Sequence, residues 1–294
     1  MKREKSTLQS HVNNSILSPF VKWAGGKRQL LPDIKRRLPT RYGRYIEPFV
    51  GGGAVCFALA QSGSLINDKN PALIHTYHTI QQHTEELIAT IRILDDGIIS
   101  GRKEYYYEKR ARYNEKLRQS CYDTETAALF IFMNKHCFNG LYRVNRHGAF
   151  NVPYNGSIRT SMDEKNIRAI AAFLDSIEIT QGDFEIAAER AEAGDFVFFD
   201  SPYAPLNPTS FEAYTKEGFE RKDHERLASL YRKLTKRGCY CMLTNHNTEF
   251  IRTLYDGFHI AVVTARRAIN SDASKRTGEE VIICNYETSE EKTK

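Results

Sequence analysis

The sequence lacks the features that mark several common classes of protein. No apolar run in its 294 residues approaches the roughly 20 needed to cross a bilayer, and the first stretch, MKREKSTLQSHVNNS, has no apolar signal-peptide core. Neither G-x-G-x-x-G nor G-x-x-x-x-G-K-[ST] occurs, which argues against a dinucleotide or a nucleoside triphosphate site. We therefore expect a cytoplasmic protein that makes no membrane contact.

Metal-binding signatures are missing as well. The cysteines form no C-x-x-C pair, a spacing that metal and redox sites commonly use. We interpret all six as reduced core residues: Cys56, Cys121, Cys137, Cys239, Cys241 and Cys284. Three histidines on one expected helix are predicted to face solvent: His75, His78 and His83. No metal is expected.

Positive charge is concentrated in two zones, although the formal net charge is only +6. Residues 1–46 hold eleven Lys or Arg and two acidic residues. Residues 126–160 contain no Asp or Glu, and their basic residues alternate with aromatic ones: Lys135, Arg143, Arg146 and Arg159 with Phe138, Tyr142, Phe150 and Tyr154. A solvated face is the simpler interpretation of either zone alone, whereas the two together favour a polyanion such as nucleic acid.

Short apolar stretches alternate with helical patterns over most of the chain, which predicts an α/β fold with a mostly parallel sheet covered on both faces. Strands are expected at 18–23, around 45–49, and at 64–68, 176–180, 195–200 and 239–244, with a final pair at 258–265 and 279–287. The pattern changes between about 97 and 165. We therefore expect a flexible tail at 1–18, an α/β domain at 19–75 and 166–294, and a recognition domain at 76–165.

The stretch EPFVGGG, residues 47–53, places three glycines where a strand turns into a helix. Glycine allows the backbone to approach a ligand closely and to adopt positive φ. Asp68 ends the next expected strand, 15 residues after Gly53, where an acidic residue commonly accepts hydrogen bonds from ribose hydroxyls. A nucleoside-containing cofactor and an ordinary tight turn remain alternatives at this point.

The stretch FVFFDSPYAPL, residues 196–206, runs from an apolar strand into a carboxylate, a rigid turn and an aromatic ring. Open α/β sheets hold their ligands at the carboxyl ends of strands. Asp200 and Tyr203 are therefore predicted to lie in a site.

Several motifs together resemble the Dam-type family of DNA adenine methyltransferases, especially its GATC-methylating, alpha-class members. In chain order they are FVKWAGGK, EPFVGGG, IND, NGLYRVN with FNVPY, QGDF, and DSPY with the adjoining APL. The resemblance runs nearly from end to end. It implies a Rossmann-like S-adenosylmethionine-dependent methyltransferase sheet with an inserted, mainly helical DNA-recognition domain. It also implies a monomer that acts on double-stranded DNA in the nucleoid of a prokaryote, or that is encoded by a phage, with restriction-modification as one role.

The resemblance also implies site residues. The expected catalytic turn is Asp200, Ser201, Pro202 and Tyr203. The expected contacts to S-adenosylmethionine are Trp23, Lys27, Glu47, Phe49, Asp68, Asp183, Phe184 and Asp200. The expected contacts to DNA are Lys22, Asn139, Leu141, Arg143, Arg146, Pro153, Arg266 and Arg267. Arginine can pair bidentately with the major-groove edge of guanine, so Arg143 is predicted to read a base. Arg146, Arg159 and the basic loop at 266–276 are predicted to contact phosphates.

One residue departs from the family's Asp-Pro-Pro-Tyr pattern, because Ser201 stands where the first proline is usual. A backbone carbonyl is expected to hold the target amine, and serine still presents one. Chemistry on a base requires that the base leave the duplex, and Tyr203 is expected to stack on it. Two other functions remain open: a catalytically weakened homologue that only binds DNA, and a methyltransferase that acts on adenine in RNA.

Overall fold

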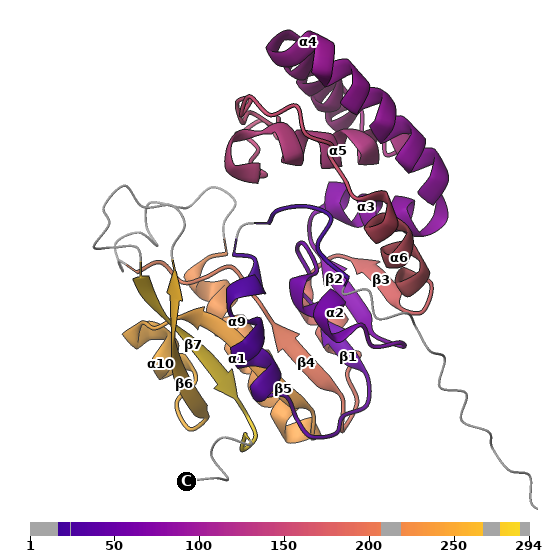
Figure 1. Ribbon diagram of the computed structural model, residues 1–294. Coiled ribbons are helices and arrows are strands. Elements are labelled where there is room, and N and C mark those ends of the chain that lie inside the picture. Colours follow the sequence, from indigo (N-terminus) through magenta and orange to yellow (C-terminus); the bar gives the residue numbers. More distant parts are fainter. Residues whose placement is uncertain (1–16, 24, 207–218, 267–276, 289–294) are drawn as a thin grey trace, which may run out of the picture.

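The computed structural model describes residues 17–23, 25–206, 219–266 and 277–288. The predicted tail at 1–18 lies almost wholly outside these ranges. Figure 1 shows a twisted sheet flanked by helices, with a group of helices from the middle of the chain standing next to it. The chain leaves the sheet after β2, forms these helices and returns to the sheet at β3.

The strands are β1 (Tyr45–Glu47), β2 (Leu65–Asp68), β3 (Glu178–Gln181), β4 (Phe196–Phe199), β5 (Tyr240–His246), β6 (His259–Arg266) and β7 (Thr277–Cys284). The helices around them are η1 (Lys27–Gln29), α1 (Leu31–Arg36), α2 (Ala54–Leu59), α7 (Phe184–Ala188), α9 (Arg221–Arg237) and α10 (Glu249–Leu254). Those between β2 and β3 are α3 (Pro71–Gln82), α4 (Thr84–Arg118), α5 (Thr124–His136), η2 (Phe138–Gly140) and α6 (Glu164–Leu174).

The strands form one seven-stranded sheet in the order β3-β2-β1-β4-β5-β7-β6. Neighbours from β3 to β5 run parallel, while β7 lies antiparallel to both β5 and β6. The predicted Rossmann-like α/β sheet, with its last two strands paired, is confirmed. Between β2 and β3 the chain is mainly helical, as expected.

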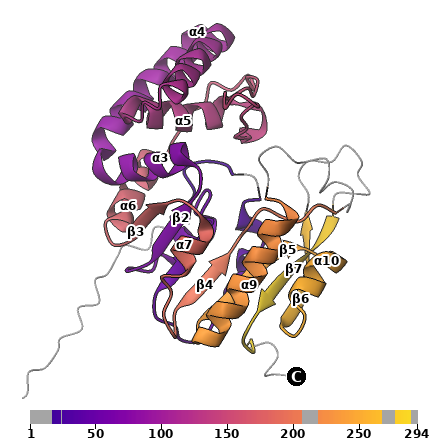
Figure 2. The ribbon, with the colours of Figure 1, turned by 180° about the vertical axis from the view of Figure 1, so that it is seen from behind.

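Both faces of the sheet are covered, because side chains alternate along each strand. In β4, Phe196 and Phe198 belong to the core that includes α1, α2 and α3, whereas Val197 and Phe199 belong to the core that includes α7 and α9. Figures 1 and 2 show α1 and α2 on one side of the sheet and α7 and α9 on the other. Burial on both sides explains why β4 is a continuous apolar run.

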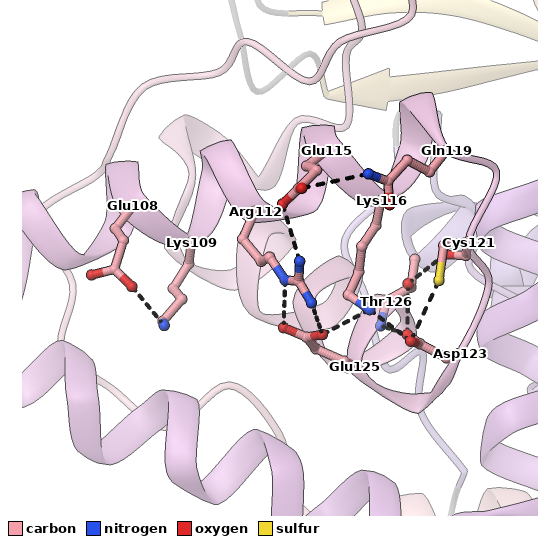
Figure 3. Close-up of polar contacts among 10 residues, drawn as sticks. All are labelled: Glu108, Lys109, Arg112, Glu115, Lys116, Gln119, Cys121, Asp123, Glu125 and Thr126. Atoms are coloured by element: carbon pink, nitrogen blue, oxygen red, sulfur yellow. Dashed lines mark hydrogen bonds and ion pairs between the residues drawn. The ribbon is translucent and has the colours of Figure 1, made fainter.

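A network of charged side chains joins the start of α5 to the end of α4 (Figure 3). Lys116 is buried, and its Nζ lies 2.6 Å from Asp123 Oδ2 and 2.7 Å from Glu125 Oε2. Arg112 contacts Glu125 through two nitrogens, at 3.1 and 3.0 Å. Asp123 also caps α5, because its Oδ1 accepts the N–H of Thr126 at 2.9 Å. The network therefore fixes where α5 begins against α4.

The strand expected at 18–23 does not form, so that prediction is wrong. Phe20 packs edge-on against Tyr77 of α3, with 4.9 Å between ring centroids. The N–H of Lys22 is bonded to Asn134 Oδ1 of α5 at 2.8 Å rather than to a neighbouring strand. The apolar residues that suggested a strand instead dock this segment on α3 and α5.

The prediction that His75, His78 and His83 face solvent is also wrong in part. His75 and His78 are half-buried, and of the three only His83 is exposed. The reason is that α3 packs against α5 and α6. Nε2 of His75 accordingly lies 2.9 Å from the carbonyl oxygen of Asp123 at the start of α5.

Five of the six cysteines are buried, which agrees with the prediction, but Cys121 is half-buried because it lies in the turn between α4 and α5. All six are free thiols. Within the described ranges, no helix is both long enough and apolar enough to cross a membrane. No cluster of three or more His, Cys, Asp or Glu side chains is placed to hold a metal ion in the same part of the chain.

Candidate active site

Three acidic residues follow neighbouring strands at one edge of the sheet. Glu47 ends β1, Asp68 ends β2 and Asp200 follows β4, and the order β2-β1-β4 makes these strands adjacent. The carboxyl ends of parallel strands lie along one edge, which is where open α/β sheets hold ligands. The structure therefore brings together three residues that the sequence motifs placed in one site.

The glycine loop after β1 packs closely against Trp23. Gly51 has a φ of +49°, and a Cβ built on it would lie 2.6 Å from Trp23 Cδ1, so the indole can occupy this position only because residue 51 is glycine. The N–H of Gly51 donates to Asp68 Oδ2 at 3.0 Å. The indole also stacks on Tyr142, with 5.6 Å between centroids and 19° between planes. Trp23 and Asp68 belong to separate motifs, and both contact Gly51 of the glycine loop.

Asp200 is anchored by a cation and a hydroxyl. Lys27 Nζ lies 2.5 Å from Asp200 Oδ1, and Thr244 Oγ1 donates to the same oxygen at 3.0 Å. The Lys27 side chain is only 4% exposed, and its Nζ also donates to the carbonyl oxygen of Gly25. Burial raises the pKa of Asp200 above its ordinary value, and Lys27 opposes that rise. Among the described residues, both contacts to the Asp200 carboxylate are therefore made to the same oxygen, Oδ1.

The ring of Tyr203 is fixed by three other side chains. Its hydroxyl donates to Glu280 Oε2 at 2.8 Å, its ring meets His246 edge-on at 4.8 Å, and Lys27 Nζ lies 4.6 Å from its centroid. Burial first, and then Asp200 and Glu280, raise the pKa of Tyr203 well above its ordinary value. The phenol therefore stays a neutral donor at any working pH.

An aromatic cluster lies where the QGDF motif meets the glycine loop. Phe184 stacks on Phe49, with 5.1 Å between centroids and 26° between planes. Asp183 caps α7 by accepting the N–H of Glu185 at 2.9 Å, and its other oxygen accepts a hydrogen bond from Arg226 at 2.7 Å. Arg226, on α9, also lies over the ring of Phe184 at 4.5 Å. Arg226 thus holds both residues of the predicted adenine-binding pair.

Glu47 differs from the other carboxylates because it lies inside the protein. It is 2% exposed, and its Oε2 accepts a hydrogen bond from the hydroxyl of Tyr45 at 2.8 Å. Burial raises the pKa of Glu47 well above the ordinary value of 4.5, an effect that Tyr45 opposes and nearby Asp200 adds to. The side chain of Glu47 is therefore buried next to Tyr45 at the end of β1, and its predicted contact with the cofactor stays a prediction.

The raised pKa of Glu47 predicts a specific dependence of stability on pH. Between pH 4.5 and the raised pKa, the folded chain keeps a proton that the unfolded chain has lost, so the free energy of unfolding falls as pH rises. Gln cannot ionise, so the melting temperature of Glu47→Gln minus that of the wild type should increase from pH 5 to pH 8. Thermal unfolding at several pH values measures this difference.

Glu178→Gln provides the matched control. Two hydrogen bonds from Arg190 lower the pKa of Glu178, so this carboxylate is ionised in both states throughout the same pH range. Its substitution should shift the melting temperature by a constant amount. A constant difference for Glu47→Gln as well would contradict the assignment.

The segment before Lys27 also contacts the predicted DNA-recognition region. The side-chain amide of Asn134 accepts from the N–H of Lys22 and donates to its carbonyl oxygen, each at 2.8 Å, and also donates to the carbonyl of Gly140 at 3.0 Å. The close approach of Lys22 requires glycine at 140, because a Cβ there would lie 2.6 Å from Lys22 Cδ. Lys22 itself is exposed. The structure thus places Lys22 beside the NGLYR segment.

Most of the remaining predicted DNA contacts lie on or next to a short hairpin-like loop, which is marked by bridges between Cys137 and Tyr154 and between Val144 and Phe150. The exposed Arg143 donates from Nε to Asn151 Oδ1 at 3.2 Å. Asn139 has a φ of +58°, and Leu141 is half-buried. Arg146 and Pro153 are exposed, and Arg159 lies exposed beyond them.

Arg266 is described only as the last residue of β6, and Arg267 lies outside the described residues.

Several residues that build the site carry no motif of their own. Asn134 lies in the largely apolar α5, Arg226 in the charged and amphipathic α9, and Thr244 near the end of β5. Each acts on a partner at least 40 positions away in sequence. The local signals were weak: Asn134 and Thr244 are polar residues in largely apolar elements, and Arg226 is one of many charged residues in α9.

Comparisons with known proteins support a family assignment. A family model described as "D12 class N6 adenine-specific DNA methyltransferase" matches residues 23–269. The type II methyltransferase M.MjaIII of Methanocaldococcus jannaschii is 44% identical and covers 92% of this chain and 99% of the relative. M1.LlaDCHI of Lactococcus lactis subsp. cremoris is 40% identical, with 93% and 97% covered. The DNA adenine methylase of Haemophilus influenzae is 30% identical, with 91% and 93% covered.

Proposed function

This chain belongs to the D12 class N6 adenine-specific DNA methyltransferases, and on that premise we propose that it methylates the adenine of GATC in double-stranded DNA, with S-adenosylmethionine as methyl donor. Family membership makes it an adenine-specific DNA methyltransferase. The observation that carries the finer assignment is the Asp200 carboxylate, anchored through Oδ1 by Lys27 and Thr244 and lying beside the fixed ring of Tyr203.

The residues around the glycine loop fit a cofactor that contains a nucleoside. Asp68 is held at its strand end by the N–H groups of Gly51 and Asn70, at 3.0 and 2.9 Å, where a carboxylate can accept ribose hydroxyls. Phe49 is half-buried and offers aromatic surface for an adenine ring, while the buried Phe184 stacks on Phe49 and supports it. S-adenosylmethionine, when bound here, supplies a methyl group carried on a positively charged sulfur.

The acceptors at the catalytic turn explain how a poor nucleophile can react. The lone pair of the exocyclic amine of adenine is delocalised into the ring. Asp200 Oδ2 and the carbonyl of Ser201 would each accept one N–H, which draws the nitrogen toward a tetrahedral form and localises its lone pair. A nitrogen–carbon bond would form as the sulfur–carbon bond of the methyl donor breaks. The electron pair of that bond would stay on the sulfur, and the surplus N–H proton would pass to Asp200 Oδ2 and on to solvent. Positioning and fixed charge provide this kind of catalysis.

Tyr203 has the position and the rigidity to receive the base. A duplex hides the amine, so the adenine must be extruded before it can react. Stacking on an aromatic ring is worth roughly 1–3 kcal/mol per base. A ring already fixed by Glu280, His246 and Lys27 loses little freedom when the base arrives.

Arg143 supports the proposal that guanine is read directly. Asn151 holds its Nε, so the two terminal nitrogens of the guanidinium are presented together, as the bidentate contact to guanine O6 and N7 requires. We assign residues 76–165 as the DNA-recognition domain, and residues 19–75 with 166–294 as the cofactor-binding and catalytic domain. The resemblance of the NGLYRVN and FNVPY segments to GATC-methylating enzymes favours GATC as the target.

Replacing Ser201 by the proline usual in the family should change the rate only mildly. Ser201 is 2% exposed, and its hydroxyl has no hydrogen-bond partner among the described residues. Its assigned role uses only the backbone carbonyl, and proline mainly adds rigidity, worth about 0.4–1 kcal/mol. Ser201→Pro should therefore raise the single-turnover methylation rate by less than about tenfold. A thousandfold increase would show that the serine severely disables the turn.

Methyl transfer to defined oligonucleotides tests the proposed target. The purified protein is incubated with radiolabelled S-adenosylmethionine and duplexes that contain GATC or a single-base variant of it, and modified adenines are mapped at single-base resolution. Label should appear on the GATC adenine. Preferential methylation of another sequence would overturn the target assignment, and preference for an RNA of the same sequence would overturn the assignment to DNA.

A further inference from the structure

The turn that carries Asp200 and Tyr203 has no secondary structure of its own, yet its chemistry needs fixed geometry. It leaves the sheet after β4, next to β5. The residue that follows the turn, Ala204, is fully buried, while Pro202 is exposed. The contacts that hold the turn must therefore come from outside it.

Two residues at the end of β5 are hydrogen-bonded to the backbone N–H and carbonyl groups of Ala204. Asn245 Oδ1 accepts the N–H of Ala204 at 2.9 Å, and His246 Nδ1 lies 2.7 Å from its carbonyl oxygen. A carbonyl oxygen can only accept, so Nδ1 of His246 carries the proton in this contact. The residue before this pair, Thr244, donates to Asp200. Three consecutive residues of one strand thus contact the first residue of the catalytic turn and the residue that follows it.

The antiparallel pair of β5 and β7 also provides the contacts to the ring of Tyr203. His246 and Glu280 stand directly opposite each other in the ladder between these strands. Tyr203 spans this cross-strand pair, because its ring packs edge-on against His246 and its hydroxyl donates to Glu280. The ring therefore takes its orientation from two side chains whose relative position a rigid ladder sets.

The buried side-chain amide of Asn245 lowers the stability of the fold unless it has a further role. It is 0% exposed, and its Nδ2 has no hydrogen-bond partner among the described residues. Buried polar groups are nearly always paired, so an apolar side chain would suit this place better if packing were its only task. What Asn245 provides in exchange is one oxygen that accepts the N–H of Ala204 and the N–H of its neighbour His246, each at 2.9 Å.

We propose that Asn245 and His246 are positioning residues that clamp Ala204, and through it set Asp200, the Ser201 carbonyl and Tyr203 for methyl transfer. This inference rests on the proposed function of the turn. Neither residue touches the reacting atoms. A displacement of about 1 Å at a reacting group can cost about a hundredfold in rate. The clamp is therefore expected to act on the chemical step and not on cofactor affinity.

His246 allows its two contacts to be separated. His246→Phe keeps a ring beside Tyr203 and removes the donor to Ala204, while His246→Asn keeps a donor near the position of Nδ1 and removes the ring. Asn245→Leu removes the acceptor from the other side. Asn285→Leu is the matched control, because Asn285 makes the same kind of contact at the opposite end of β5, where its Oδ1 accepts the N–H of Cys241 at 2.7 Å.

Each variant is compared by its single-turnover rate at saturating S-adenosylmethionine and GATC duplex, expressed per cofactor-binding molecule, together with the dissociation constant for the cofactor and the melting temperature. Asn245→Leu and His246→Phe should lose about 10–100-fold in rate with little change in cofactor affinity, and His246→Asn should recover most of the loss. Asn285→Leu should lower the melting temperature but leave the rate per binding molecule intact.

The proposed clamp would be overturned if Asn245→Leu and His246→Phe kept the wild-type rate. It would also be overturned if His246→Phe and His246→Asn lost equally in rate. An equal loss in Asn285→Leu would do so too, because it would show a general effect of stability. If Asn245→Leu does not fold, the two His246 variants decide. Failure of the proposed function has a different signature, since the wild type itself would then not methylate the GATC duplex.

Discussion

Replacing Asp200 by alanine should lower the single-turnover rate of methyl transfer by about 10²–10³, the loss typical when one preorganised polar group is removed from a reacting centre. The reason is that one acceptor for the target amine disappears. Lys27, which is 4% exposed, also loses its carboxylate and becomes a buried cation without that partner. Rapid quenching of enzyme preloaded with labelled cofactor and mixed with excess GATC duplex measures the rate.

Asp195→Ala provides the control for this variant, because Asp195 precedes the same strand at the opposite edge of the sheet. Its carboxylate is equally engaged, accepting the N–H of Arg44 at 2.8 Å and that of Glu192 at 2.9 Å. Its loss should reduce stability and leave the rate per folded molecule nearly unchanged, because distant sites act independently. If Asp200→Ala kept more than a tenth of the wild-type rate, the carboxylate would not be the principal acceptor.

Replacing Arg143 by alanine should abolish discrimination at one guanine of the target. A bidentate arginine–guanine pair provides about 1–3 kcal/mol of discrimination, or about 5–150-fold in relative rate between GATC and the duplex with that guanine replaced. The variant should methylate the two duplexes at similar rates. Competition between the duplexes in one reaction, followed by mapping of the modified adenines, gives the ratio directly.

Arg146→Ala distinguishes a base reader from a phosphate contact on the same loop. Both arginines are exposed, but we assign Arg146 to the DNA backbone. Its loss should weaken binding to every sequence alike and reduce the slope of affinity against salt concentration by about one. If Arg143→Ala behaved in the same way, with discrimination preserved, the base-reading role would belong to another residue.

The fold and the edge that carries the site were predictable because their signals are local. Alternation of apolar strands and helices gave the sheet, and the residues that follow its strands, Glu47, Asp68 and Asp200, could be placed at a common edge. Glycines marked the close approach at Gly51. Such features depend on a few neighbouring residues, and their physics does not require knowledge of the rest of the chain.

The supports of the site could not be predicted, because their roles arise from tertiary contacts. Asn134, Arg226 and Asn245 are single polar residues in regular secondary structure, and each meets its partner only when the chain is folded. The wrong prediction of a strand at 18–23 has the same origin. Its apolar pattern was real, but helices rather than a neighbouring strand cover it: Phe20 packs on Tyr77.

The segment from Phe20 to Lys27 has a consequence for how such enzymes acquire new targets. Lys22 is hydrogen-bonded to α5, Trp23 stacks on Tyr142 after η2, and Lys27 is paired with Asp200. The region that we assign to DNA recognition is therefore packed against the segment that carries Lys27. In a chimaera that takes only residues 76–165 from a homologue, Lys22 and Trp23 would face contact residues that do not match them. Evolutionary changes of the target sequence should therefore be accompanied by changes at Lys22 and Trp23.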